Sequence, residues 1–166
     1  MDGIDEIVKA HACPVYAPTK NKGQIPKVTN YLNEGDVLKF LDLEIEVLEL
    51  PGHTMGHIAF WIPTKKWLFS GDVVFALGCG RLFEGTFKQM FEALQRIKDL
   101  PPETLIFCTH DYFPANSEFC ASQNIQIQDY DSIHPLLLSQ EIEFNPFLKS
   151  PTLEEFTANR KARNSF

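Results

Sequence analysis

Three short motifs, each directly after an apolar segment, constrain the fold of this chain more than any other feature. The first is Pro-Gly-His, which ends at His53, and the second is Ser-Gly-Asp, which ends at Asp72. The third is Cys-Thr-His, which ends at His110. Because the ends of strands in one sheet share a rim, we expect these three side chains to converge there. Imidazole and carboxylate groups gathered at one point predict a metal site.

Each of these predicted ligands has a simpler alternative. His53 can be a polar surface residue beside a turn, Asp72 an ordinary turn aspartate, and His110 the first residue of a helix. A carboxylate can bridge two metal ions and hold them roughly 3.5–4 Å apart, as in two-metal hydrolysis, whereas an imidazole cannot. This difference favours Asp72 as a shared ligand. Nitrogen and oxygen ligands together suit zinc, iron and manganese alike.

The remaining histidines are interpreted as structural or surface residues. His57 stands four residues after His53, which is the spacing of paired zinc ligands on a helix. Proline and glycine residues in the same segment argue against a helix, so the two rings need not share a face. We therefore interpret His57 as a structural histidine whose ring bonds to nearby backbone. His11 and His134 lie in helical or exposed contexts.

Arginines at two places suggest that the chain binds an anion. Arg81 follows Gly78 and Gly80, which allow a ligand to approach the backbone closely. Arg160 and Arg163 are three residues apart, so they share one face of a predicted helix. The simpler alternatives are an ordinary glycine-rich loop and a solvated helix face. Both interpretations stay open on these residues alone.

Composition and charge argue against several classes of function. The formal net charge is −7 and the pI is about 5.2, which argue against nucleic acid or an anionic membrane as a partner. No apolar run is long enough to span a bilayer, and residues 1–15 do not resemble a signal peptide. The four cysteines contain no CxxC pair, which indicates reduced thiols, and Cys79 has no neighbour that would activate it as a nucleophile. We expect an acidic cytoplasmic protein.

The apolar patterns predict strands interleaved with helices, followed by a helical tail. Strands are predicted at residues 14–17, 36–40, 43–50, 58–62, 67–69 and 105–108, with an irregular loop at 71–85. Helices are predicted at residues 4–10, from Thr86 to just before Pro101, and at 115–123, 129–143 and 152–163. Thr86 and Gln89 have the spacing of a capping box. This order of elements favours a layered α/β fold with a helical appendage.

Longer blocks around these motifs resemble glyoxalase II, the hydroxyacylglutathione hydrolase branch of the metallo-β-lactamase fold. The blocks are residues 53–57, 69–72, 78–86, 107–112, 145–147 and 160–166, in family order. The resemblance implies an α/β fold in the form of a truncated metallo-β-lactamase-like αββα sandwich, with the C-terminal sheet and helices of that fold. It also implies a partial metallo-β-lactamase-like domain at residues 1–113. Residues 114–166 would form a helical region that binds glutathione.

The same resemblance implies roles for individual residues. His53 would bind one divalent metal ion, His110 a second, and Asp72, the catalytic carboxylate, would bridge both. Zinc is the first choice of metal, with iron or manganese as alternatives. The residues that would hold the glutathione moiety of a thioester substrate are Arg81, Tyr112, Arg160 and Arg163. His57 matches a family position that is not a ligand.

The chain departs from the family pattern in two ways. Phe83 stands where a tyrosine is usual, Thr109 where a glycine is usual, and Asp111 where a glutamate is usual. More importantly, residues 1–166 contain no T-H-x-H-x-D-H motif, which supplies further metal ligands in the family, and none of the strands that precede it. Each metal would keep one histidine and the shared aspartate, whereas catalytic zinc normally has three protein ligands. The missing strands would also leave an apolar sheet face exposed.

Three hypotheses for function follow. The chain belongs to a hydrolase of S-2-hydroxyacylglutathione thioesters, such as S-lactoylglutathione. Alternatively, it is a catalytically incompetent remnant or half-protein that self-associates or pairs with a separate N-terminal segment. The third hypothesis is a non-catalytic binder of glutathione conjugates, which would use Arg160 and Arg163.

Overall fold

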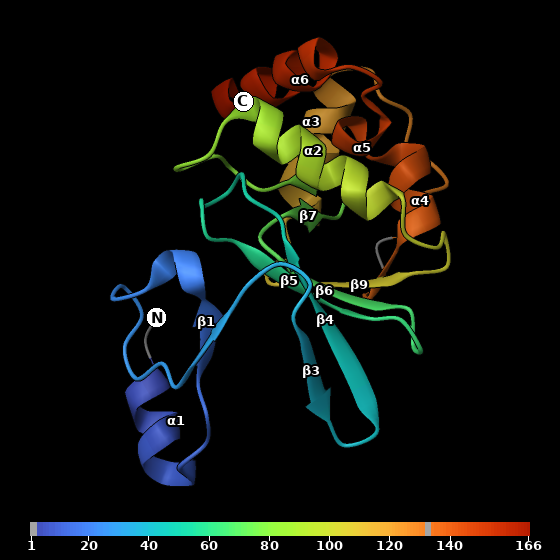
Figure 1. The fold of residues 1–166 in the computed structure, drawn as a ribbon. Helices are drawn as coiled ribbons and strands as arrows, with labels where there is room; N and C mark the ends of the chain where they lie inside the picture. Colours follow the sequence, from blue (N-terminus) through green and yellow to red (C-terminus); the bar gives the residue numbers. More distant parts are fainter. Residues whose placement is uncertain (1–2, 132–133) are drawn as a thin grey trace.

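The computed structural model describes residues 3–131 and 134–166, and a six-stranded sheet forms its centre (Figure 1). In spatial order its strands are β10 (Leu136–Leu137), β9 (Leu105–Cys108), β6 (Trp67–Gly71), β5 (Ile58–Ile62), β4 (Leu43–Glu49) and β3 (Val37–Phe40). Neighbouring strands are antiparallel except β6 and β9, which run parallel. The chain between β6 and β9 contains a helix, as a parallel crossover requires.

Five helices pack on one side of this sheet. They are α2 (Phe87–Lys98), α3 (Phe113–Ser122), α4 (Leu138–Phe144), α5 (Pro146–Lys149) and α6 (Leu153–Ser165). The predicted capping box of α2 is confirmed, because the Thr86 side chain accepts from the Gln89 N–H while the Gln89 side chain accepts from the Thr86 N–H. The Thr152 side chain caps α6 in a similar way, since it accepts from the backbone N–H of Glu155.

The main core lies between the sheet and these helices. Trp61, Leu68 and Ile106 are cross-strand neighbours on the helix side of the sheet, and all three are buried. They belong to the same apolar cluster as Met90 and Leu94 of α2. A helix with one buried apolar stripe thus covers a sheet face whose alternate residues are apolar, which is the expected layered packing.

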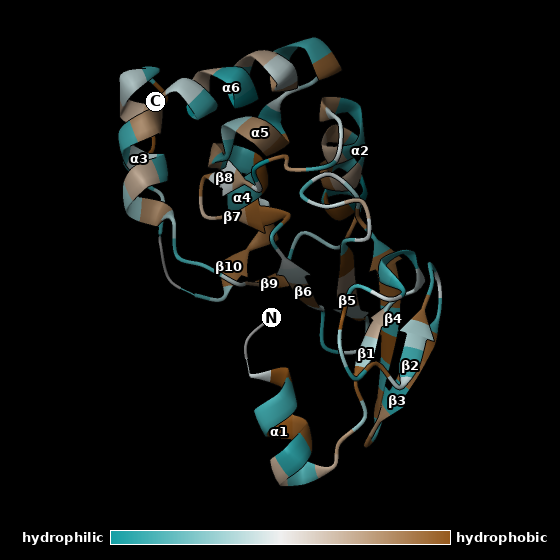
Figure 2. Ribbon diagram, turned by 90° about the vertical axis from the view of Figure 1, so that its left-hand side faces the viewer, coloured by the Kyte–Doolittle hydropathy of each residue, from teal (hydrophilic) through white to brown (hydrophobic). Residues whose placement is uncertain are grey.

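The N-terminal elements lie away from the helical layer, on the other side of the sheet (Figure 2). They comprise α1 (Ile4–His11), a 3₁₀ turn (Thr19–Asn21), and the parallel pair β1 (Tyr16–Pro18) and β2 (Asn30–Leu32). Of the expected αββα layers, the described residues therefore contain one helical layer and one large sheet. The second sheet is represented by the β1–β2 pair, and α1 buries none of its residues.

Two sequence-based predictions of local structure are wrong in part. The predicted helix at 129–143 is a helix only from Leu138, and residues 132–133 lie outside the described part. Ahead of it Leu136 pairs with Ile106 of β9, so its backbone bonds to the sheet instead of to a helical turn. The loop at 71–85, predicted as irregular, contains the hairpin of β7 (Val74–Phe75) and β8 (Gly78–Cys79).

The sheet face opposite the helices is apolar, and part of it is open to solvent, as the sequence predicts. Val47, Phe60, Phe69 and Phe107 are cross-strand neighbours on this face; Val47 is buried, whereas Phe69 is 40% exposed. At its edge Phe40 is 63% exposed. This face contains a hollow of about 280 Å³. The residues that line it are Tyr16 of β1, Leu38, Lys39 and Phe40 of β3, Ile45 of β4, Phe60 and Ile62 of β5, and Phe69 of β6. Within residues 3–131 and 134–166, no helix is long and apolar enough to cross a membrane.

We expect this open face to cause self-association of the 166-residue chain. Replacing both Phe40 and Phe69 with lysine should weaken association at least about tenfold, because each buried phenylalanine contributes roughly 1.5–3 kcal/mol. Sedimentation velocity over a concentration series measures the effect. Leu41→Lys is the matched control, since Leu41 is 87% exposed at the β3–β4 turn and does not line the hollow. A wild-type chain that stays monomeric at every concentration would contradict the prediction.

Candidate metal centre and adjoining pocket

Strand direction explains why the three predicted ligands meet. Because β6 and β9 are parallel and Gly71 lies opposite Cys108, the residues that follow, Asp72 and His110, leave the sheet at one edge. β4 is antiparallel to β5, and β5 is antiparallel to β6, so β4 also ends at this edge. His53 lies on the connection from β4 to β5. The sheet therefore brings the three side chains together, as the sequence predicts.

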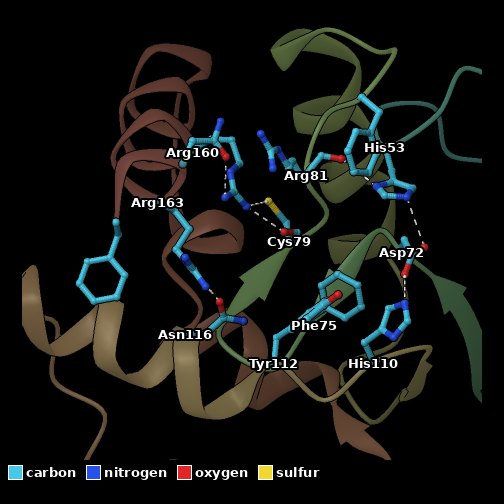
Figure 3. A pocket seen from close by; sticks show the side chains of 13 residues that line it. His53, Asp72, Phe75, Cys79, Arg81, His110, Tyr112, Asn116, Arg160 and Arg163 are labelled. Atoms are coloured by element: carbon cyan, nitrogen blue, oxygen red, sulfur yellow. Dashed lines mark hydrogen bonds and ion pairs between the residues drawn. The ribbon is translucent and has the colours of Figure 1, made fainter.

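Asp72 lies between the two imidazoles (Figure 3). Its Oδ2 is 3.3 Å from Nε2 of His53, and its Oδ1 is 3.5 Å from Nε2 of His110. The Thr109 hydroxyl donates a hydrogen bond to the same Oδ1. Each carboxylate oxygen thus faces a different imidazole nitrogen, which is the arrangement that a bridging carboxylate requires.

The orientation of His53 is set by its surroundings. Its Nδ1 lies 2.7 Å from the backbone carbonyl oxygen of Arg81, and with the proton on Nδ1 the ring donates to that oxygen. In that tautomer Nε2, which faces Asp72, keeps a free lone pair. The Phe83 ring packs against the imidazole at 5.0 Å between ring centroids, at an angle of 72°. A carbonyl that orients a histidine in this way is a common feature of metal ligands.

The three side chains fit part of a two-metal site. Imidazole nitrogen and carboxylate oxygen suit zinc, iron and manganese. Within the described part of the chain, however, no three His, Cys, Asp or Glu side chains surround a single point as metal ligands. His11, an exposed residue of α1, does not line the pocket described below. Each of two ions would thus have one histidine and the shared Asp72 as ligands, and each would need further donors.

The ring of His57 bonds to backbone, as predicted for a structural histidine. Its Nε2 accepts from the backbone N–H of Asp72, with 3.0 Å between the two nitrogens. Burial lowers the pKa of His57 to about 4, and the nearby His53 acts in the same direction, while Asp72 opposes both. The ring is therefore neutral near pH 7, and the nitrogen that faces Asp72 is already engaged.

A pocket of about 540 Å³ extends from these ligands toward the C-terminal helix (Figure 3). Its lining includes all seven residues that the sequence predicts for the site: His53, Asp72, Arg81, His110, Tyr112, Arg160 and Arg163. Among the described residues, none of its three arginines has a carboxylate within ion-pair distance. The pocket therefore joins a carboxylate–imidazole cluster at one end to unneutralised guanidinium groups at the other.

Arg160 is buried, so the alternative of a solvated helix face is wrong for this residue. It is 6% exposed, and its guanidinium lies over the Phe147 ring, 5.2 Å from the centroid. One terminal nitrogen donates to the carbonyl oxygen of Cys79 at 2.9 Å, and the other donates to Oδ1 of Asn164 at 2.9 Å. The Nε–H has no hydrogen-bond partner within the described part of the chain.

Arg163 and Arg81 differ from Arg160 in exposure. Arg163 is partly buried, and its Nε donates to Oδ1 of Asn116 at 3.2 Å. Burial lowers the pKa of Arg163, and the positive charge of Arg160 adds to this effect. Arg81 is exposed, and its guanidinium lies over the Phe83 ring, 5.8 Å from the centroid. Arg81 and Arg163 are therefore more accessible to a ligand in the pocket than the buried Arg160.

Sequence reasoning missed the side chains that hold the β7–β8 hairpin, which forms one wall of the pocket. Asn145 donates to the carbonyl oxygens of Phe75 and Gly78 at 3.2 and 2.9 Å, and Asn116 donates to that of Ala76 at 2.9 Å. Leu77 donates its N–H to Oε2 of the buried Glu141 at 3.0 Å. Asn116 lies within a predicted helix and Asn145 between two predicted helices, in the 145–147 block, and neither position by itself predicts such a role.

Comparison with known proteins places the chain in a family. Residues 4–110 match the Metallo-beta-lactamase superfamily. A hydroxyacylglutathione hydrolase of Bdellovibrio bacteriovorus is 48% identical over an alignment that covers 99% of this chain and 74% of the relative. Another, of Nitrosomonas eutropha, is 42% identical over 99% of this chain, which spans 62% of that relative. The chain belongs to the hydroxyacylglutathione hydrolase family.

A solved structure agrees with this assignment. The crystal structure of TTHA1623 in a di-iron-bound form matches with a TM-score of 0.63 and 29% sequence identity, over 87% of this chain and 70% of that one. Family membership and this match confirm the predicted resemblance and the α/β, metallo-β-lactamase type of fold. The chain is thereby placed among metal-dependent hydrolases.

Cys79 lines the pocket, yet we expect it to be unreactive in the folded protein. Burial raises the pKa of its thiol to about 11, and Arg160 only partly opposes this effect. At pH 8 the thiolate fraction is then on the order of one in a thousand. Iodoacetamide at pH 8 should therefore modify the less buried Cys13 well before Cys79, as measured by peptide mass spectrometry. Equal rates in the folded chain would contradict this, and equal rates in denaturant are the control.

Proposed function

We propose that this chain carries part of the active site of a hydrolase for S-2-hydroxyacylglutathione thioesters, with S-lactoylglutathione as an example. In this reaction the oxygen of water bonds to the thioester carbonyl carbon, the C–S bond breaks, and glutathione leaves as its thiol. The observation that carries the proposal is the pocket itself, in which the Asp72 carboxylate lies between His53 and His110 at one end and arginines line the other.

His53 and Asp72 would hold one divalent metal ion, and His110 and Asp72 the second. When bound, such ions supply Lewis acidity and activate water at neutral pH. Zinc is our first choice, and iron or manganese suit the same donors. The chain contributes the shared carboxylate, and the carbonyl oxygen of Arg81 keeps His53 in the tautomer that leaves Nε2 free.

The glutathione moiety would occupy the arginine end of the pocket. Glutathione is anionic and peptide-like, so guanidinium groups without carboxylate partners are suitable for binding it. We assign Arg81, Arg163 and the Tyr112 hydroxyl to direct contacts because their side chains are exposed or only partly buried. Arg160 would act without direct contact: its buried positive charge would attract the anionic moiety, and its hydrogen bond to the Cys79 carbonyl oxygen would position the pocket wall. In this proposal residues 114–166 form the substrate-binding region, and residues 1–113 carry the metal ligands.

A second candidate function is supported by the open sheet face and by the small number of ligands. On this proposal the 166-residue chain is one half of the active unit. A further polypeptide segment would cover Phe60, Phe69 and their neighbours and would bring the metal ligands that the described residues lack. A non-catalytic binder of glutathione conjugates would use the arginine end alone. All four cysteines are unpaired thiols, which fits the cytoplasm as the location in either case.

The first test is hydrolysis of S-lactoylglutathione by the purified chain supplied with zinc, iron or manganese. We expect turnover that depends on the added metal and falls by on the order of a hundredfold or more in Asp72→Asn, which keeps the shape of the side chain but removes its charge. Circular dichroism checks that the variant is folded. Turnover in the presence of a chelator, or turnover unaffected by Asp72→Asn, would contradict the assignment. No turnover with any metal would favour the half-protein, and turnover after addition of a ligand-bearing segment would then establish it.

A second test addresses the arginine end of the pocket. Arg163→Met should raise KM about tenfold or more with little change in kcat, because it removes a charge-assisted contact made equally in the ground state and the transition state. Lys161→Met is the matched control, since Lys161 lies on the same helix, carries the same charge and does not line the pocket. If the chain alone has no turnover, calorimetric titration with S-methylglutathione provides the same comparison. Equal effects of the two substitutions would rule out a local contact.

A further inference from the structure

We propose that His57 is a positioning residue for Asp72. In this proposal the imidazole does not bind metal or substrate. It accepts a hydrogen bond from the backbone N–H of Asp72 and thereby sets where the carboxylate stands relative to His53 and His110. The consequence for metal binding rests on the proposed function, whereas the hydrogen bond and its effect on the turn can be tested without any metal.

The backbone at Asp72 needs such an acceptor. Asp72 directly follows β6, and the pairing of β6 with β9 is already irregular between Phe69 and Gly71. The Asp72 N–H consequently has no sheet partner, and Nε2 of His57, 3.0 Å away, is its acceptor. His57 itself directly precedes β5, the strand next to β6. The ring thus spans from one strand to the end of its neighbour.

Gly71 shows how closely the ring and the turn are matched. Its φ is +56°, in the left-handed region that glycine adopts readily. A Cβ at this position would lie 2.7 Å from Nε2 of His57, closer than a carbon atom is found in real structures. The turn that directs Asp72 toward the metal ligands therefore depends on a glycine, and the imidazole occupies the space that any other residue would fill.

The hydrogen-bonding pattern also excludes His57 as a further metal ligand. Because Nε2 accepts from the backbone, the neutral ring carries its proton on Nδ1. That Nδ1 is shielded from solvent and has no partner among the described residues. Buried donors without partners are uncommon and call for an explanation. Here the explanation is that the turn requires an acceptor at Nε2, which leaves the proton of the neutral ring on Nδ1. The spacing of His53 and His57, four residues apart, therefore marks one candidate ligand and one positioning residue.

The decisive experiment compares two amide side chains that differ by one methylene group. His57→Gln can place its Oε1 near the position of Nε2, whereas the Oδ1 of His57→Asn reaches only the position of Nδ1. Amide hydrogen exchange of Asp72, followed by NMR in metal-free protein, is the readout. We expect exchange in the Asn variant to be about tenfold faster or more, and exchange in the Gln variant to stay within a few-fold of wild type. The Leu68 amide, in the middle of β6, reports global opening and should not change.

Metal binding provides the second readout. If Asp72 helps to bind the ions, the Asn variant should bind Zn²⁺ about tenfold more weakly than the Gln variant, as is typical for residues that orient metal ligands. Rescue by Gln separates positioning from a general loss of stability. Equal Asp72 exchange in the two variants would overturn the proposal. A difference in exchange without any Zn²⁺ binding by the wild-type chain would support the positioning role and count against the metal site instead.

One measurement does not depend on any variant folding. In the ¹⁵N-labelled wild-type chain, His57 should be the tautomer with Nδ1 protonated, and a scalar coupling should link Nε2 of His57 to the amide nitrogen of Asp72. A protonated Nε2, or an Asp72 amide that exchanges as fast as that of an unstructured peptide, would refute the proposal.

Discussion

The parallel pairing of β6 with β9 is the constraint on which the candidate site depends. This register places Gly71 opposite Cys108, so Asp72 and His110 leave two adjacent strands at the same level of one edge. The antiparallel β4–β5 pair adds His53 at the same edge. The pairing of these strands therefore determines where the backbone segments that carry the candidate ligands lie. Side chains that rigid strands position in this way are preorganised for binding.

The C-terminal helices fix the wall of the pocket next to the candidate ligands. The β7–β8 hairpin lies between Asp72 and Arg81, and its carbonyl groups accept from Asn116, Asn145 and Arg160. The carboxylate of Glu141 is buried beside this hairpin and accepts from Leu77, Tyr130 and Asn145. Burial nevertheless raises its pKa, although these hydrogen bonds oppose the effect. Because these hydrogen bonds connect Asn116, Asn145 and Arg160 to the same hairpin, the hairpin wall and the buried Arg160 form a single connected unit.

Local sequence patterns predicted much of this architecture. The capping box of α2, the bounds of β5 and β9, and the convergence of the strand-end ligands all follow from periodicity and turn residues. The prediction failed where a distant contact overrode the local pattern. Leu136 pairs with β9 although its segment has helical spacing, and Asn116 holds the hairpin although it looks like an ordinary helix residue. Neither interaction leaves a trace within a short window of sequence.

The sequence by itself determined the identity of the candidate ligands, the type of most elements and the resemblance to a hydrolase family, because each of these depends on a few neighbouring residues. Only the tertiary structure decided that Arg160 is buried, that the backbone group bonded to His57 is the Asp72 N–H, and that Phe40 and Phe69 are the side chains exposed on the apolar sheet face. These properties depend on which strands and helices meet and in what register. That information arises from packing between residues far apart in the chain.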